Sequence, residues 1–494
     1  KDSRSSHIYG THSGQEFPAA LLQGIAERLK KSPPEDWARV EVYVNTRRMQ
    51  RRLSHLFLQG PARLMPKLHL ITDLAKNPVL SSLPMPVPAL QRRLEIAQLV
   101  RGLLSRVDGL APRSAVFDLA KSLATLMDEM QGEGIAPEAI SSLDVSDVSG
   151  HWERALQFIE LVRHYFEDGA KPDVETRQRA CVLALSESWK TSPPQHPIIL
   201  AGSTGSRGTT FQLMMAVAGL PQGALVLPGF DFDMPARVWD KLADPKTSED
   251  HPQFRFSRLL KSLDMAPEEV GAWATTPPKT RARNKLISLA LRPAPVTHHW
   301  RKEGPALECL DEATHNITWL EAPNQRVESM AIALRLRQAA ETGQTVAVIT
   351  PDRNLTRRIA AALAAWNIIP DDSAGIPLNL TATGRFLLHI LDLAQPQITS
   401  EALLVLLKHP LAHSGQERGQ HLLNTRDLEV YLRRRGPAFL SPQTLLRWSK
   451  DKDHYSLWVS WVIDCVFTQW PTSSQPLTHW LDHHCIIARR LSDG

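Results

Sequence analysis

The amino-terminal part of the chain alternates short apolar runs with longer amphipathic stretches. Short apolar runs occur at 7–9, 40–44 and 68–71. Between the first two runs, apolar residues at 21–29 recur at the spacing of one helix face. Strands that alternate with helices pair in parallel, because each helix carries the chain back along the sheet. We therefore expect an α/β fold with a parallel, doubly wound sheet.

A proline-rich segment at 83–88 interrupts this pattern and is typical of a stiff linker. From there to about residue 189 the apolar spacing is mostly helical. Helices are predicted at 90–104, 114–130, 151–166 and 174–189. The range 83–192 is therefore expected to be a helical insertion in the α/β lobe.

The strand pattern returns at 193–312. A strand is predicted at 197–201, a Gly/Ser/Thr turn at 202–208, then a helix and a second strand at 225–227. Strand, small-residue turn and helix in this order are the layout of a parallel-sheet nucleotide-binding unit. Ligands of such sheets bind at the carboxyl ends of the strands, so the loops that follow the strands are the candidate sites.

A second α/β pattern begins near Asn316. Strands are predicted at 317–320 and 346–349, and a helix follows each of them. Asp352 is placed to cap the second of these helices. Beyond 396 the pattern is mainly helical.

Composition narrows the class of protein only a little. The 494 residues allow about two to four domains. A net charge of +5 permits an anionic partner without requiring one. No apolar run approaches the roughly 18 residues of a membrane span, and the four scattered cysteines are typical of a reducing cytoplasm. The chain starts without Met and stops at Gly494, so we expect a fragment of a longer protein.

The loop after the first strand resembles a phosphate-binding loop that has lost its chemistry. A working loop, GxxxxGK[ST], needs a lysine for the phosphates and a hydroxyl for Mg²⁺. Here Gly10, Ser13 and Gly14 are followed by Gln15 and Glu16. A carboxylate at this place repels phosphate, so a lost ATP site is the favoured interpretation, with weak nucleotide binding as the alternative.

The strand at 197–201 lacks the acid that would hold a metal ion in a Walker B motif, because Gly202 follows it. The next hydroxyls are too weakly acidic to replace a carboxylate. The turn has two interpretations: an anion nest in which Ser203, Thr204 and Arg207 hold a DNA phosphate, or a plain turn between strand and helix.

The strongest basic feature follows the second strand. Arg47, Arg48, Arg51 and Arg52 fall at i,i+4 spacing and cover one broad helix face. Like charges so close destabilise a helix unless an anion neutralises them. The patch therefore indicates either phosphate contacts or a solvated helix end.

Three other patterns favour plain helix surfaces. Asp128-Glu129 imitates a Walker B end, but the apolar residues before it share a helix face. The charge run Arg433–Arg435 is typical of a solvated face. His479, His483, His484 and Cys485 have no second ligand pair to complete a metal site.

The ordered segments of the chain resemble AddB, the partner subunit of the AddAB helicase–nuclease. The matching segments, in order, are VEVYVNTRRMQRRL, LMDEMQGEG, HPIILAGSTGSRG, ALVLPGFDFD, ARNKLISLALRPAPVT, ITWLEAP, RVESMAIALRLR, AVITPDRNLTRRIAAAL, IIPDDSAGIPLNLTATGRFLLHIL and LLVLLKHPL. No single segment is decisive, but the ordered set is fairly specific.

The resemblance implies a superfamily 1 helicase architecture with two RecA-like lobes, each carrying a helical insertion. Lobe 1 would comprise 1–82 and 193–312 around the insertion 83–192. Lobe 2 would begin with 313–395, holding Thr383 and Arg385 as DNA-binding candidates, and 396–494 would be its truncated insertion. Family members end in a nuclease domain with an iron–sulfur cluster. That domain is absent from this chain, so the cluster and Mg²⁺ of the family would belong to the missing part and no cofactor is expected here.

The expected function is a degenerate helicase-like subunit in recombinational repair of DNA double-strand breaks. Its partners would be a broken duplex end or single strand and an ATP-driven AddA-type subunit, in the cytoplasm and without a membrane. Two alternatives stay open: a divergent ATPase or translocase that uses the 10–17 loop, and an adaptor without DNA contact.

Overall fold

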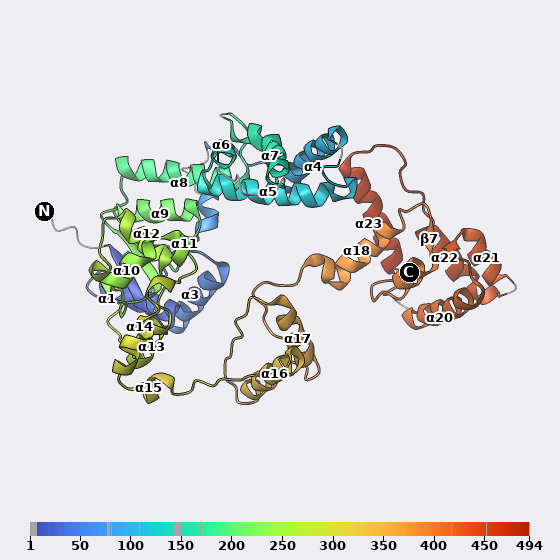
Figure 1. Ribbon diagram of the computed structural model, residues 1–494. Helices are drawn as coiled ribbons and strands as arrows, with labels where there is room; N and C mark the ends of the chain where they lie inside the picture. Colours follow the sequence, from blue (N-terminus) through green and yellow to red (C-terminus); the bar gives the residue numbers. More distant parts are fainter. Residues whose placement is uncertain are drawn as a thin grey trace. The chain divides into compact units, whose positions relative to one another are not determined.

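The computed structural model of the protein describes residues 7–76, 80, 82–107, 109–142, 151–167, 169–415, 417–450 and 452–493. The chain divides into two compact units, Lys1–Thr318 (unit 1) and Trp319–Gly494 (unit 2) (Figure 1). Two stretches of the predicted domains, 1–6 and 143–150, lie outside the described residues.

Unit 1 is built on a six-stranded sheet in which all neighbouring strands run parallel. The strands are β1 (Ile8–His12), β2 (Glu41–Val44), β3 (Lys67–Leu70), β4 (Ile198–Ala201), β5 (Gly223–Phe230) and β6 (Gly271–Ala272). Their order across the sheet is β3-β2-β4-β5-β1-β6. The predicted parallel α/β sheet is confirmed, and it is consistent with a RecA-like α/β fold. The two-residue β6 was not predicted, because so short a strand leaves no apolar period.

Helices cover both faces of this sheet, because right-handed crossovers that run in opposite directions along it fall on opposite faces. The connections after β1 and β2 run one way, and those after β4 and β5 run the other way. The helices nearest the sheet are α1 (Phe17–Arg28), α3 (Arg47–Gln59), α8 (Val174–Thr191), α9 (Gly208–Ala218) and α12 (Phe254–Ser262).

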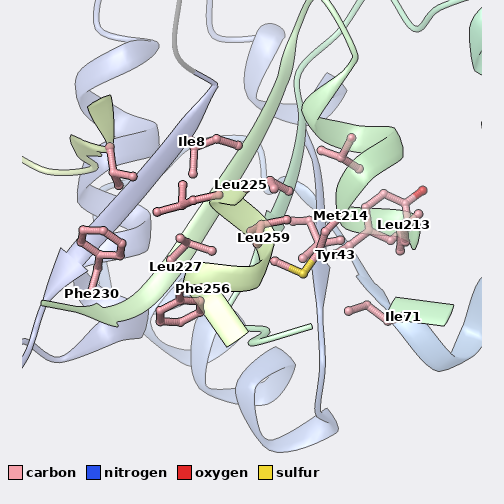
Figure 2. Packing of buried hydrophobic residues seen from close by; sticks show 14 of the residues in the cluster. Ile8, Tyr43, Ile71, Leu213, Met214, Leu225, Leu227, Phe230, Phe256 and Leu259 are labelled. Atoms are coloured by element: carbon pink, nitrogen blue, oxygen red, sulfur yellow. The ribbon is translucent and has the colours of Figure 1, made fainter. Parts of the chain in front are cut away.

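The two cores follow from the alternation of side chains along β2. Val42 points to the face that buries Leu21 of α1 and Leu53 of α3. Tyr43 points to the opposite face, where it shares a core with Leu213 of α9 (Figure 2). A strand buried on both faces is apolar throughout, which is why the predicted strands were continuous runs.

The predicted insertion is helical in the described residues. Its helices are α4 (Ala89–Arg106), α5 (Val116–Glu133), α6 (Pro137–Ser141) and α7 (His151–Val162), followed by α8, which falls in the predicted range but packs into the core of the sheet. Ile96 and Val100 of α4 pack with Met127 of α5 in a separate core. Asp128 and Glu129 lie within α5, so the prediction of a helix rather than a Walker B strand is confirmed.

Unit 2 lacks the two strands that the sequence predicted. The segments 317–320 and 346–349 are extended but irregular, whereas α16 (Gln325–Glu341) and α17 (Arg353–Ala364) form as predicted, with Asp352 capping α17. A strand requires a hydrogen-bonded neighbour, and the described residues supply none for these segments. Trp319 and Ile349 are therefore 89% and 97% exposed. A second parallel-sheet lobe stays a prediction.

The remainder of unit 2 is a helical domain with a short antiparallel pair, β7 (Ile398–Thr399) and β8 (Phe439–Leu440). Its helices are α18 (Ala382–Asp392), α19 (Ser400–Leu407), α20 (Arg418–Arg435), α21 (Pro442–Ser449), α22 (Ser456–Val466) and α23 (Leu477–Asp493). The buried histidines of this domain include His421, which uses both ring nitrogens. His421 Nε2 hydrogen-bonds to the Leu407 carbonyl at 2.7 Å, and Trp458 Nε1–H donates to His421 Nδ1 at 3.0 Å.

This pairing predicts that unit 2 loses stability in mild acid. Burial lowers the pKa of His421, the Leu407 hydrogen bond opposes that shift, and the nearby His413 and Arg418 add to it. The folded state then binds fewer protons than the unfolded state, so this stability is present above pH 6.5 and is lost as pH falls below it. Protonation of Nδ1 removes the acceptor of Trp458, at a cost of about 1–3 kcal/mol.

Urea unfolding followed by tryptophan fluorescence at several pH values measures this effect. His421→Gln keeps one donor and one acceptor, so it should flatten the dependence of unfolding free energy on pH. The exposed His479 on α23 provides the control, and His479→Gln should leave the dependence unchanged. Equal pH profiles for native protein and His421→Gln would contradict the assignment.

Candidate nucleic-acid interface at the carboxyl edge of the sheet

The loops that follow β1, β2 and β4 meet at the carboxyl edge of the sheet, as parallel strands require. Asn45, after β2, donates from its side-chain amide to the Gly202 carbonyl after β4, at 3.0 Å. Arg52 of α3 pairs with Glu16, which precedes α1. The structure thus brings the degenerate loop, the arginine helix and the 202–208 turn together at one edge.

The arginine helix presents its charges to solvent. Thr46 caps it, because its hydroxyl accepts from the Met49 amide at 3.1 Å. Leu53 is buried, whereas the four predicted arginines, Arg47, Arg48, Arg51 and Arg52, are all exposed. Within the part of the chain that the structure describes, Arg47 and Arg51 make no ion pair or hydrogen bond. The edge therefore carries positive charge that its own acids do not neutralise.

The loop at 10–17 is filled by its own side chain. Gln15 Oε1 accepts from the His12 amide at 3.1 Å, and Gln15 Nε2 donates to the Thr276 carbonyl at 2.7 Å. The Ser13 hydroxyl donates to the Gly229 carbonyl at 3.4 Å. A phosphate-binding loop offers its amides to the ligand, but here Gln15 already takes one of them. Gly10, in the strand that leads into this loop, has no room for a side chain, because a Cβ there would lie 2.6 Å from Phe230.

A carboxylate stands at the start of the helix that follows this loop. Glu16 is the residue before α1, and it lies between the helix and Arg52. A helix amino terminus attracts anions through its free amides and its dipole. Glu16 therefore places a carboxylate beside the start of α1, paired with Arg52 and without a hydrogen bond to the helix amides.

Gly202 occupies the place of the metal-holding acid, and its backbone excludes a side chain. Its φ of +76° lies in the left-handed region. A Cβ there would lie 3.1 Å from the ring of Phe17. Restoring an acid at this position would thus strain the backbone and crowd the start of α1.

We expect Gly202→Asp to lower the free energy of unfolding by roughly 1–3 kcal/mol and to create no ATPase activity. Gly202→Ala separates the backbone effect from the charge, and Gly219→Ala at the end of α9 is its control. Gly219 has a helical φ of −82° and only ordinary contacts, so its replacement should change stability by less than about 0.5 kcal/mol. Urea denaturation measures all three, and equal losses for the two alanine variants would contradict the strain at Gly202.

The 202–208 turn already holds an internal anion. Glu133, at the end of α5, accepts from the Gly208 amide at 2.6 Å and so caps α9. The Ser203 hydroxyl accepts from the Gly205 amide at 3.2 Å, and Arg207 lies 3.5 Å from Glu175. Of the predicted phosphate contacts in this turn, Thr204 and Arg207 are exposed, whereas Ser203 is buried. Sequence reasoning missed Glu133 because it lies 75 residues away from Gly208, and no local pattern marks it.

The remaining DNA-binding candidates lie in unit 2. Thr383 and Arg385 are exposed on the first turn of α18, which Thr381 caps. The Arg385 guanidinium donates to the Leu380 carbonyl at 3.1 Å, so it folds back on its own helix start. These residues belong to unit 2, whereas the arginine helix and the 202–208 turn belong to unit 1.

The histidine pattern at 479–484 was not expected to bind a metal ion. His479, His483 and His484 lie on α23, and His484 is bonded to the Leu387 carbonyl at 3.0 Å. Among the described residues, no three or more His, Cys, Asp or Glu side chains form a group suited to a metal ion. The described helices also include none that is long and apolar enough to cross a membrane.

Comparison with known proteins adds no family assignment. A scan against protein-family models finds no model that matches the chain. A search of curated proteins also finds no match.

Proposed function

We propose that this chain is a degenerate helicase-like, DNA-binding subunit of an AddAB-type helicase–nuclease. In this role it acts in recombinational repair of DNA double-strand breaks, holding a broken end or single strand for an ATP-driven AddA-type partner. The proposal combines the segment-by-segment resemblance to AddB with the chemistry at the carboxyl edge of unit 1.

One observation carries the proposal. At the edge where a motor protein would bind a nucleotide, the chain's own side chains occupy the phosphate-binding loop, while the arginine helix at the same edge is exposed. Gln15 and Glu16 occupy the loop that would hold phosphates. Arg47 and Arg51, on the helix whose Arg52 pairs with Glu16, are exposed and have no partner in the described part of the chain. This lobe keeps the parallel α/β sheet of a motor protein, but it presents arginines to solvent instead of a nucleotide site. Such a surface is suited to binding a phosphate backbone.

Unit 2 supports the finer assignment to a two-lobed superfamily 1 architecture. Two extended apolar segments, 317–320 and 346–349, each precede a capped helix, and α16 and α17 share a small core around Ala333 and Leu363. This order is half of a parallel α/β lobe. We infer that 313–395 is the first part of a second RecA-like lobe and that 396–494 is its helical insertion.

The nuclease chemistry of the resembling family has no counterpart in these residues. An iron–sulfur cluster requires several cysteine thiolates at one place. Cys181 and Cys465 are buried, Cys309 and Cys485 are exposed, and the pairs 181/309 and 465/485 belong to different units. These residues do not fit a cluster, so the proposal assigns no cofactor or nuclease step to this chain.

A salt titration of single-stranded DNA binding tests the proposal. If the edge contacts phosphates, the logarithm of affinity should fall linearly with the logarithm of salt, with a slope of about 0.7 per phosphate neutralised. Anisotropy of a labelled oligonucleotide measures the slope. Affinity that ignores salt would remove the phosphate contacts, and the absence of DNA binding would favour an adaptor. DNA-stimulated ATP turnover that is lost on changing Gly14 would favour the divergent ATPase.

A further inference from the structure

A cavity of about 120 Å³ lies at the carboxyl ends of β1 and β5. It is separate from the arginine helix, on the other side of the loop that follows β1. α1 follows β1 on one face of the sheet, and α12 lies beyond β5 on the other face. The chain segments that follow β1 and β5 therefore pass to opposite faces of the sheet. Such a switch point is where open parallel sheets bind ligands.

Hydrogen bonds within the cavity wall hold the side chains of Gln253 and His251 in place. Gln253 Oε1 accepts from the Asp231 amide at 3.1 Å, and Gln253 Nε2 donates to the Gly229 carbonyl at 2.9 Å. The His251 ring bonds to the Leu291 carbonyl through Nε2 at 2.6 Å, and its Nδ1 accepts from the Gln253 amide at 3.1 Å. His251 therefore has no ring nitrogen left for a ligand, whereas Gln253 keeps the second N–H of its side-chain amide.

Two acceptors keep capacity for a ligand. One oxygen of Asp231 accepts from the Asp233 amide at 3.0 Å, and Ser288 hydrogen-bonds to the same carboxylate. A carboxylate has about four acceptor sites, so part of its capacity stays open. Asn284 donates from its side-chain amide to the Ser13 carbonyl at 3.1 Å, which leaves its Oδ1 without a donor among the described residues. These open acceptors favour a ligand that brings N–H groups.

The charge around the cavity favours a cation. The charged groups that interact with the cavity wall are Asp231, Asp233, Asp250, Arg281 and Arg292. Acids outnumber cations in this set. Arg292 is buried and bound to Glu303 at 3.3 Å and to the Ser288 hydroxyl at 3.2 Å, so it is committed to its own network.

The apolar part of the wall selects the kind of cation. The ring centroids of His12 and Phe232 lie 4.6 Å apart in the cavity wall, to which Ile287 and Leu291 contribute aliphatic surface. An ammonium is strongly hydrated, whereas a guanidinium is planar, weakly hydrated and stacks on aromatic rings. A guanidinium also matches a carboxylate with two parallel hydrogen bonds.

We propose that this cavity binds a guanidinium group, with Asp231 as its carboxylate partner and Asn284 as a second acceptor. The group comes either from a free small molecule or from an arginine side chain of a partner protein. The site does not use the arginine helix and does not depend on DNA binding.

Titration of the purified chain with N-propylguanidine, followed by calorimetry or ligand-observed NMR, tests the site. N-Butylamine serves as the ammonium control of similar length. Saturable binding of propylguanidine, about tenfold tighter than butylamine or better, is expected. Asp231→Asn should weaken it about tenfold or more, whereas Asp240→Asn, at an exposed acid outside the cavity, should leave it unchanged.

A second variant guards against loss of folding in Asp231→Asn. Ile287 is 42% exposed at the cavity rim, so Ile287→Trp should block entry while leaving the Asp231 network in place. The tripeptide acetyl-Gly-Arg-Gly-amide identifies the source: binding of both ligands assigns a partner's side chain, and binding of propylguanidine alone assigns a free small molecule. No saturable binding to the native chain, or full binding by both cavity variants, would overturn the site.

Discussion

Replacing Arg47 and Arg51 together by alanine is expected to weaken binding of single-stranded DNA about twenty-five-fold at about 0.1 M salt. Each phosphate contact contributes about 0.7 to the salt slope, which is about fivefold in affinity at that concentration. Two lost contacts also lower the slope by about 1.4. Arg48 and Arg52 are kept in this variant because each already interacts within the chain. Anisotropy of a labelled oligothymidine across a salt series measures both quantities.

The sheet itself provides a matched control. Arg39 is exposed and precedes β2, whereas Arg47 follows it, so one strand separates the two residues. Arg39→Ala should leave the affinity and the slope unchanged. Arg48→Ala alone should weaken binding nearly equally for all DNA sequences, because phosphate contacts carry no base information. Native affinity in the double variant would remove this edge as the interface and favour the adaptor.

Asp173→Ala is expected to lower the free energy of unfolding by about 3–5 kcal/mol, because it removes the buried carboxylate partner of a buried guanidinium. Arg92 of α4 and Asp173 are only 6% and 4% exposed, and Arg92 Nε lies 2.5 Å from the carboxylate. Gln131 of α5 donates to the same carboxylate at 2.9 Å, and Arg92 also donates to the Lys171 carbonyl at 2.8 Å. The network joins α4 and α5 to the segment that leads into α8.

Urea denaturation followed by circular dichroism measures this loss, since the insertion is helical. Glu95 provides the control, because it is the more exposed partner of Arg92, at 2.7 Å. An ion pair of that kind contributes at most about 1 kcal/mol, so Glu95→Ala should have a small effect. Similar losses for Asp173→Ala and Glu95→Ala would show that Asp173 is not the anchor of this guanidinium.

The arginine helix shows how far local pattern reaches. Its start at Arg47, the cap at Thr46 and the exposure of the four arginines were all predictable from the sequence. A cap and a helix face depend on residues within a few positions of one another. The loop defects at Gln15 and Gly202 were equally visible, because each is a missing residue type at a known position in a motif.

The segments 317–320 and 346–349 show where local pattern fails. Their apolar runs predict strands, and the capped helices after them form as predicted. The strands are not formed because a strand depends on a neighbour that the local sequence does not specify.

Which side chains occupy the carboxyl edge of the sheet also depended on contacts between residues far apart in the sequence. Glu133 reaches Gly208 across 75 residues, and Gln15 reaches Thr276 across 261. The cavity at Asp231 exists because β1 and β5, more than 200 residues apart, lie side by side.

The sequence alone therefore determined which residue types are present and which helices form. Those properties follow from side-chain chemistry and from the 3.6-residue period, both of which act over a few residues. The tertiary structure decided the strand order and which amides and carboxylates were already partnered. Those outcomes follow from long-range packing and hydrogen bonding, so the filled nucleotide loop, the internally capped α9 and the acceptor-lined cavity became visible only in the folded chain.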